Sequence, residues 1–212
     1  SVSRLLLVVM LGCLPATAAR AAVYCASTES ELRAALAAIG SSFSSENVEI
    51  RLTRRVYFNG AQEFALQVPG PPGDLVLSGG WAAGASTACD IQAIDARLTV
   101  IDAQGASPVL SIRRTSISGS ITPLIRVTNL TLRNGSAASA PVGLNIYNAF
   151  GSIEVDNVIV HGNRALSSQF LGGVAMTLDS TTRDITLRNS LIYDNQGQFI
   201  TGFELTSVVF TS

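Results

Sequence analysis

Short stretches of alternating apolar and polar residues predict that most of this chain forms β-strands. Val48–Thr53 has an apolar residue at every second position, which gives a strand one face to bury. Further short runs, each bounded by Gly, Pro, Asp or Ser, carry a similar signal: Phe64–Val68, Leu75–Leu77, Leu98–Ile101 and Val109–Ile112. No helical periodicity separates these runs, so an all-β region is expected.

One helix is predicted near the N-terminus, at about residues 29–39. Thr28 to Glu31 reads Thr-Glu-Ser-Glu, a capping box that satisfies free N–H groups at a helix start. Gly40 suits the position just after the last helical turn. Between them, apolar residues recur at helical spacing, at Leu32, Ala35, Leu36 and Ile39.

An internal repeat is the most informative pattern in the chain. Ile125–Arg133, Ile153–His161 and Ile185–Tyr193 align without gaps and recur after 28 and then 32 residues. Each copy is an alternating strand, an Asn and a second short apolar strand. The central residues are Asn129, Asn157 and Asn189, and a second Asn closes each copy, at Asn134, Asn163 and Asn195.

The repeat predicts a coil of stacked parallel strands. Asn tolerates the left-handed backbone of a sharp turn better than any residue except Gly, so the central asparagines are expected at turns. Their side chains would then line up and hydrogen-bond along the stack. A β-sandwich or barrel is the alternative for short strands between turns, but the repeated register favours a parallel β-helix.

The first residues have the order of a secretory signal peptide. Arg4 precedes an apolar run, Leu5–Gly12, and small residues follow up to Ala22. We expect a signal peptide at residues 1–21 and export, with a buried N-terminal helix as the alternative. The apolar run is far shorter than the ~20 residues of a spanning helix, so no transmembrane helix is expected. Met10–Cys13 loosely resembles a bacterial lipobox, which leaves lipidation of Cys13 as a second interpretation.

The remaining composition limits the partners. All 14 basic residues are Arg, and removal of Arg4 and Arg20 leaves 12 against 15 acidic residues, so nucleic-acid binding is not favoured. A single His and no phosphate-binding loop indicate no metal site and no cofactor. Cys25 and Cys89 survive cleavage, and in an oxidising compartment they could form a disulfide.

Several segments resemble the right-handed parallel β-helix family, also called pectin-lyase-like, in its secreted bacterial and polymorphic outer-membrane-protein types. The segments are Leu77–Trp81, Thr99–Asp102, Leu130–Gly135, Asn163–Ala165 and Gly172–Ala175. The resemblance implies an all-β, right-handed solenoid at residues 22–212, with its clearest rungs at about 125–200 and the helix at about 29–39 as an N-terminal cap. Because Thr206–Ser212 is still strand-like, we expect a C-terminally truncated coil that continues beyond residue 212.

Two functions from different classes fit this fold, which by itself assigns neither. The first is a non-catalytic exported scaffold or adhesin-like protein, secreted or on the cell surface or outer membrane, with a polysaccharide or another cell-surface molecule as partner. In register, Arg126 lies beneath Glu154 and Asp156 beneath Arg188, and such neutralised pairs are typical of a structural surface. His161, Tyr193 and Arg133 form one outward column that could contact a sugar ring.

The alternative is a polysaccharide lyase or glycoside hydrolase. Enzymes of the fold need clustered carboxylates, with Ca²⁺ in the lyases and a strong base such as Arg. The densest polar group is Asp179, Arg183 and Asp184, with Asp194 nearby in the sequence, although Asp179–Asp184 is first interpreted as a turn. Ca²⁺ is implied only under this alternative, and the non-catalytic function is favoured.

Overall fold

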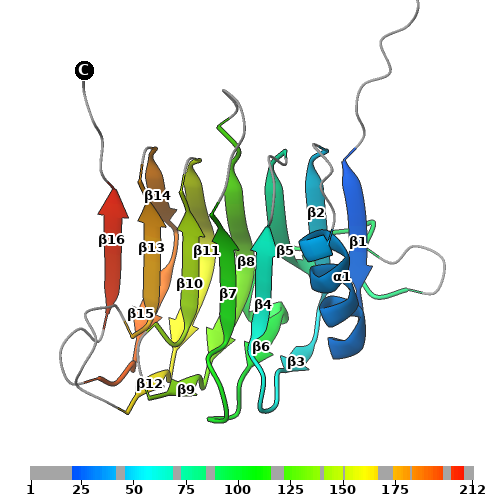
Figure 1. Cartoon of the computed structure of the whole chain (residues 1–212). Helices are drawn as coiled ribbons and strands as arrows, with labels where there is room; N and C mark the ends of the chain where they lie inside the picture. Colours follow the sequence, from blue (N-terminus) through cyan, green and yellow to red (C-terminus); the bar gives the residue numbers. More distant parts are fainter. Residues whose placement is uncertain are drawn as a thin grey trace, which may run out of the picture.

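The computed structural model describes residues 21–41, 46–68, 73–84, 89–115, 122–138, 141–149, 151–166, 174–181, 183–197 and 202–207. The expected signal peptide lies outside these residues except for Ala21, and so does Cys13. The described chain is nearly all strand with one α-helix (Figure 1). In order, its elements are β1 (Ala22–Ala26), α1 (Glu29–Ser41), β2 (Val48–Thr53), β3 (Val56–Phe58), β4 (Phe64–Val68), β5 (Leu75–Trp81), the 3₁₀ turn η1 (Ala96–Leu98), β6 (Val100–Asp102), β7 (Leu110–Arg114), β8 (Ile125–Arg133), β9 (Ser136–Ala137), β10 (Leu144–Asn148), β11 (Ile153–His161), β12 (Arg164–Ala165), β13 (Met176–Ser180), β14 (Ile185–Arg188), β15 (Leu191–Tyr193) and β16 (Phe203–Ser207).

Two parallel sheets contain most of the strands. The nine-stranded sheet follows the order β1-β2-β5-β8-β11-β14, with β3, β6 and β15 paired beside this path. The five-stranded sheet has the order β4-β7-β10-β13-β16, and β9 pairs with β12. The chain alternates between the two sheets, and each such passage is called a circuit below. The expected all-β character with parallel sheets and one helix is confirmed.

The three repeat copies pair in the predicted register. Ile153 of β11 is the partner of Ile125 in β8 and of Ile185 in β14. His161, at the end of the same strand, is the partner of Arg133 and Tyr193. Equivalent positions of the three copies therefore form columns across neighbouring circuits, and the side chains within one column can be alike or different.

The core lies between the two sheets. Ile153 and Val155 point inward from β11 and are fully buried, whereas Ile185 and Leu187 of β14 are half-buried and pack against the same core. The alternation of apolar and polar residues therefore predicted the inward face correctly. Burial is lower in β14 because, among the described strands, only β11 pairs with it.

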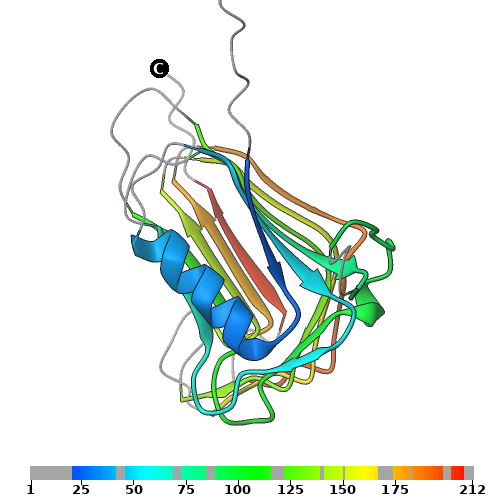
Figure 2. The same cartoon turned by 90° about the vertical axis from the view of Figure 1, so that its right-hand side faces the viewer.

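Helix α1 lies across the N-terminal end of the stack (Figure 2). Its apolar face is buried against β4 and β1. The Glu31 carboxylate accepts the Ser27 N–H at 2.6 Å, and the Thr28 hydroxyl accepts the Glu31 N–H at 3.2 Å, which satisfies two N–H groups at the helix start. The helix covers apolar residues that would otherwise face water.

Two predicted boundaries were wrong. Gly40 lies inside α1, which continues to Ser41. A Cβ atom at Gly40 would lie 3.2 Å from the Gln67 carbonyl oxygen of β4, so the glycine allows the helix to pack closely against this strand. Leu98 belongs to η1 rather than to a strand, because Asp95 accepts the Arg97 N–H and starts a 3₁₀ turn there. Leu98 is accordingly 37% exposed, whereas Val100 and Ile101 of β6 are buried.

Candidate functional site

Asparagine side chains form a column along the corner of the nine-stranded sheet. Asn129, Asn157 and Asn189 all have left-handed backbones, with φ of 63°, 53° and 51°. Asn157 donates from Nδ2 to Oδ1 of Asn129 at 2.8 Å, as the stacking of the repeat implied. Asn189 departs from this pattern, since its Nδ2 donates to Oδ1 of Asp156 at 2.8 Å. The column therefore ends on a carboxylate.

The second turn of each circuit differs from the prediction by one residue. Asn134 has a left-handed backbone, but its equivalents in the next circuits are Gly162 and Asp194, with φ of 66° and 51°. Asn163 and Asn195 follow these residues. Asn195 Oδ1 accepts hydrogen bonds from the backbone N–H of Asn163 at 3.1 Å and from its Nδ2 at 2.9 Å. They stabilise the turns through side-chain hydrogen bonds instead of left-handed backbones.

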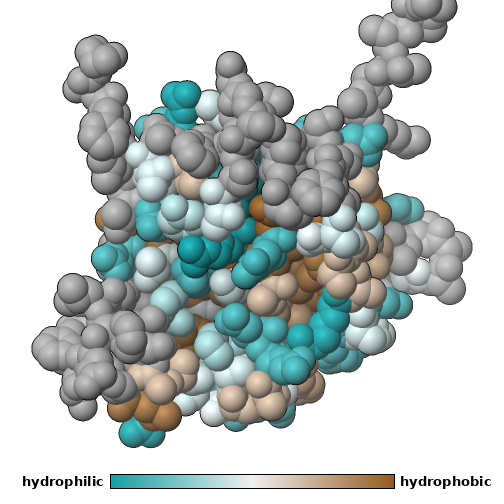
Figure 3. Space-filling model, viewed as in Figure 1, coloured by the Kyte–Doolittle hydropathy of each residue, from teal (hydrophilic) through white to brown (hydrophobic). Residues whose placement is uncertain are grey.

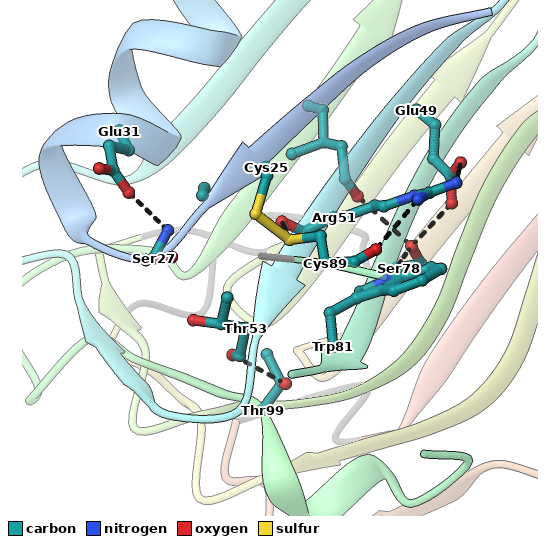
Figure 4. The surroundings of a disulfide bond; sticks show 12 residues. Cys25, Ser27, Glu31, Glu49, Arg51, Thr53, Ser78, Trp81, Cys89 and Thr99 are labelled. Carbon is teal, nitrogen blue, oxygen red and sulfur yellow. Dashed lines mark hydrogen bonds and ion pairs between the residues drawn. A yellow bond between two sulfur atoms is a disulfide. The ribbon is translucent and has the colours of Figure 1, made fainter. Parts of the chain in front are cut away.

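A long loop replaces the asparagine turn between β5 and β6. The disulfide between Cys25 and Cys89 ties this loop to β1, in keeping with the pairing expected from the sequence (Figure 4). Arg51 of β2 donates to the Cys89 carbonyl at 3.0 Å and lies over the Trp81 ring at 4.2 Å. The described part of the loop, residues 82–84 and 89–99, is therefore held at several points.

The Leu77–Trp81 segment contains two glycines for a steric reason. A Cβ atom at Gly79 would lie 2.2 Å from the Asn129 carbonyl oxygen, and Gly80 has a φ of 85°. Asn129, where the asparagine column begins, therefore occupies the space that a side chain at Gly79 or Gly80 would need.

A pocket of about 400 Å³ lies between this loop and the asparagine column. We call it the asparagine pocket. Gln92 and Ile94 of the loop were missed by sequence reasoning, because the loop has no counterpart in the repeat. The pocket is lined by Gln92, Ile94, Thr128, Asn129, Asp156, Asn157 and Asn189.

The predicted charge pairs form on the outward face beside this pocket. Arg126 pairs with Glu154 at 2.6 Å, and Arg188 contacts both Glu154 and Asp156. Burial alone would raise the pKa of Asp156, but hydrogen bonds from Asn189 and Arg188 and the positive charge of Arg188 outweigh it and lower the pKa. Asp156 is therefore an anion at neutral pH, within a locally neutral group.

An aromatic pair lies further along the same two circuits. The His161 and Tyr193 rings are stacked with centroids 4.8 Å apart and planes 3° from parallel. Arg133, the third member of the column, pairs with Asp102 at 2.8 Å. Tyr193 is 39% exposed and Leu191, on the same outward face, is 54% exposed. We call Ile159, His161, Leu191 and Tyr193 the aromatic platform.

The pH dependence of stability should report on this platform. Burial and the neighbouring Arg133 cation lower the pKa of His161 below 6.5, although Asp194 and Asp102 partly oppose the shift. Protonation therefore favours the unfolded chain, so this contribution is full above about pH 6.5 and is lost as the pH falls. We expect the melting temperature of His161→Gln to fall less than that of the wild type between about pH 7 and pH 5. Parallel curves would contradict this.

The acidic group proposed for catalysis is divided between two elements. Asp179 lies within β13, not in a turn, since it pairs in register with Tyr147 of β10. Arg183 and Asp184 are exposed and follow in the connection to β14. Asp179 instead neighbours Tyr147, whose ring contacts Arg113 at 5.0 Å. Figure 3 views this side of the molecule, where hydrophilic residues gather over the five-stranded sheet.

Asp179 is the unusual carboxylate of this face. Burial raises its pKa, and the Arg113 cation only partly opposes this. Its Oδ1 atom is buried and accepts no hydrogen bond from the residues that the structure describes. Among the described residues, no group of three or more His, Cys, Asp and Glu side chains could hold a metal ion.

Comparisons with known proteins found no match to a family model, a curated protein or a solved structure. The family resemblance inferred from the sequence therefore stays a prediction. Within the part of the chain that the structure describes, no helix is long and apolar enough to cross a membrane.

Proposed function

We propose that this chain is an exported, non-catalytic right-handed parallel β-helix that acts as a surface scaffold and contacts carbohydrate. In-register parallel pairing along both sheets supports the solenoid. The disulfide between Cys25 and Cys89 supports an oxidising compartment outside the cytoplasm. We place the protein in the secreted or cell-surface fraction.

The aromatic platform is the observation that carries the carbohydrate contact. Sugar rings have an apolar face that packs on flat aromatic surfaces. Because the His161 and Tyr193 rings stack on one another, each covers one face of its neighbour, and Tyr193, which is 39% exposed, offers the accessible aromatic surface. A pocket of about 480 Å³ adjoins the platform, because its residues Asn134 and Gly162 directly follow Arg133 and His161. Its other polar lining residues supply amide, hydroxyl and guanidinium groups for sugar hydroxyls: Gln104, Ser136 and Arg164.

Tyr193→Ala tests this function, with Tyr147→Ala as the matched control on the other sheet. We expect Tyr193→Ala to weaken glycan binding by roughly tenfold, because one stacking surface is lost, and Tyr147→Ala to leave binding unchanged. The measurement is a glycan array with the full-length secreted protein, followed by titration calorimetry on the best glycan. Equal loss in both variants would contradict a contact at the platform.

A second candidate function is a polysaccharide lyase or glycoside hydrolase. It is favoured by Asp179, since a buried carboxyl with a raised pKa is suited to general acid catalysis. Incubation of the same protein with acidic and neutral polysaccharides, with and without Ca²⁺, distinguishes the two. Release of unsaturated or reducing ends that Asp179→Asn abolishes would replace the scaffold function by an enzyme.

A further inference from the structure

The asparagine column has a fixed polarity, set where the column begins. Asn129 Nδ2 donates to the carbonyl oxygens of Gly79 and Ala93, at 2.9 and 2.6 Å. Carbonyl oxygens cannot donate, so the amide of Asn129 has one orientation and its Oδ1 points along the column. Asn157 must then present Nδ2 to that oxygen, as it does at 2.8 Å. The orientation of one amide therefore determines the next.

The same argument fixes the other amides of the pocket. Asn189 presents Nδ2 to the Asp156 carboxylate at 2.8 Å, and Gln92 presents Nε2 to the Gly79 carbonyl at 2.9 Å. One N–H donor of each of these side chains is thus directed into the protein. The oxygens of Asn157, Asn189 and Gln92 accept no hydrogen bond from a described residue, and Asp156 adds an ionised carboxylate. The asparagine pocket is rich in acceptors.

One wall of the pocket is apolar and well supported. Ile94 is 84% exposed, at the rim of the pocket. Its neighbours in the loop are held in place, because Ala93 bonds through its N–H to the Gly80 carbonyl at 2.8 Å and through its carbonyl to Asn129. Because the loop is already held in place, little conformational entropy is lost when a ligand contacts the exposed side chain of Ile94.

We propose that the asparagine pocket binds a neutral, hydroxyl-rich glycan and selects against uronic acids. Hydroxyl groups donate to the amide oxygens and to Asp156, and the apolar face of the sugar packs on Ile94. A uronate carboxylate would be repelled by the ionised Asp156, and none of the described residues that line the pocket is a cation that could pair with it. Arg126 and Arg188, the arginines of the adjacent charge group, are already paired with Glu154 and Asp156. This inference rests on the proposed carbohydrate contact but uses different residues.

Matched variants of the full-length protein test the pocket with soluble hexasaccharides. Asn189→Gly removes the amide while keeping a residue that accepts a φ of 51°. Ile94→Ser removes the apolar wall, and Ile91→Ser is its control, since Ile91 is 66% exposed in the same loop and does not line the pocket. By titration calorimetry, we expect xylohexaose, cellohexaose or maltohexaose to bind more tightly than hexagalacturonate. Asn189→Gly and Ile94→Ser should each raise the Kd by about tenfold, and Ile91→Ser should not change it.

The outcomes separate this site from the aromatic platform. Binding that Tyr193→Ala weakens but that Asn189→Gly and Ile94→Ser leave unchanged would overturn the pocket and retain the proposed function. Tighter binding of hexagalacturonate than of the neutral hexasaccharides would overturn the selectivity. Failure of all four hexasaccharides to bind would overturn both proposals. Circular dichroism of each variant before titration ensures that only folded protein is compared.

Discussion

Val155→Asp is expected to abolish folding of this protein. Val155 is fully buried between the sheets and is flanked by Val127 and Leu187 on the neighbouring strands. An unpaired carboxylate there loses its hydration without gaining a partner, and the cost exceeds the roughly 5–15 kcal/mol by which a domain is stable. The yield of soluble secreted protein and its far-UV circular dichroism on heating measure the effect.

Thr186→Asp is the control for this substitution. Thr186 is exposed on the outward face of β14, so the same added charge should leave the cooperative melting transition intact. A soluble Val155→Asp variant that melts cooperatively would show that the register of β11 is wrong. Ile185→Asp, which the sequence alone predicts to be equally severe, should cost less, because Ile185 is only half-buried and its carboxylate can reach water.

Removal of the disulfide is the second large effect expected. The bond joins residues 64 apart in sequence, and the chain-entropy model assigns about 4 kcal/mol to a loop of this length. The double variant Cys25→Ala/Cys89→Ala should therefore unfold at lower guanidinium concentration than the wild type, with a similar slope. Guanidinium titration followed by tryptophan fluorescence measures this, since Trp81 lies beside the disulfide (Figure 4).

Reduction provides an internal control for the second prediction. Dithiothreitol should lower the unfolding midpoint of the wild type to that of the double variant and should not affect the double variant. A midpoint that is unchanged in both would mean that the loop between β5 and β6 is held by its other contacts alone. Those contacts include the Arg51 hydrogen bond to the Cys89 carbonyl.

The sequence predicted the parts of the fold that repeat. A period of two within each strand determines which side chains point inward, and a gapless alignment of three copies determines which residues are neighbours in space. Ile125, Ile153 and Ile185 were therefore placed correctly, as was the pair Glu154 and Arg126. The short strands β3 and β9 were missed, because two or three residues carry too little alternation to be distinguished from a turn.

The candidate site was less predictable because part of it comes from a loop that interrupts the repeat. Gln92 and Ile94 come from a loop that has no copy elsewhere, and only the fold brings them to Asn157. Asp179 was assigned to a turn because Asp, Ser and Thr follow one another there, yet the register of β10 extends the strand through it. In contrast, the column of Arg133, His161 and Tyr193 follows directly from the alignment.

Because each circuit pairs only with its neighbours, the free energy of unfolding of this protein can be described as a sum of terms between successive circuits along the stack. Strand β8 has partners on both sides, whereas β14, among the described strands, pairs only with β11. Local opening at β14 breaks one interface, and opening at β8 breaks two, as in a linear lattice with nearest-neighbour coupling. Protection of backbone amides against hydrogen exchange should therefore decline from the middle of the stack toward β14. The asparagine pocket extends from Asn129 to Asn189, so a glycan bound there would couple a circuit that is paired on both sides to one that, among the described strands, is paired on one side.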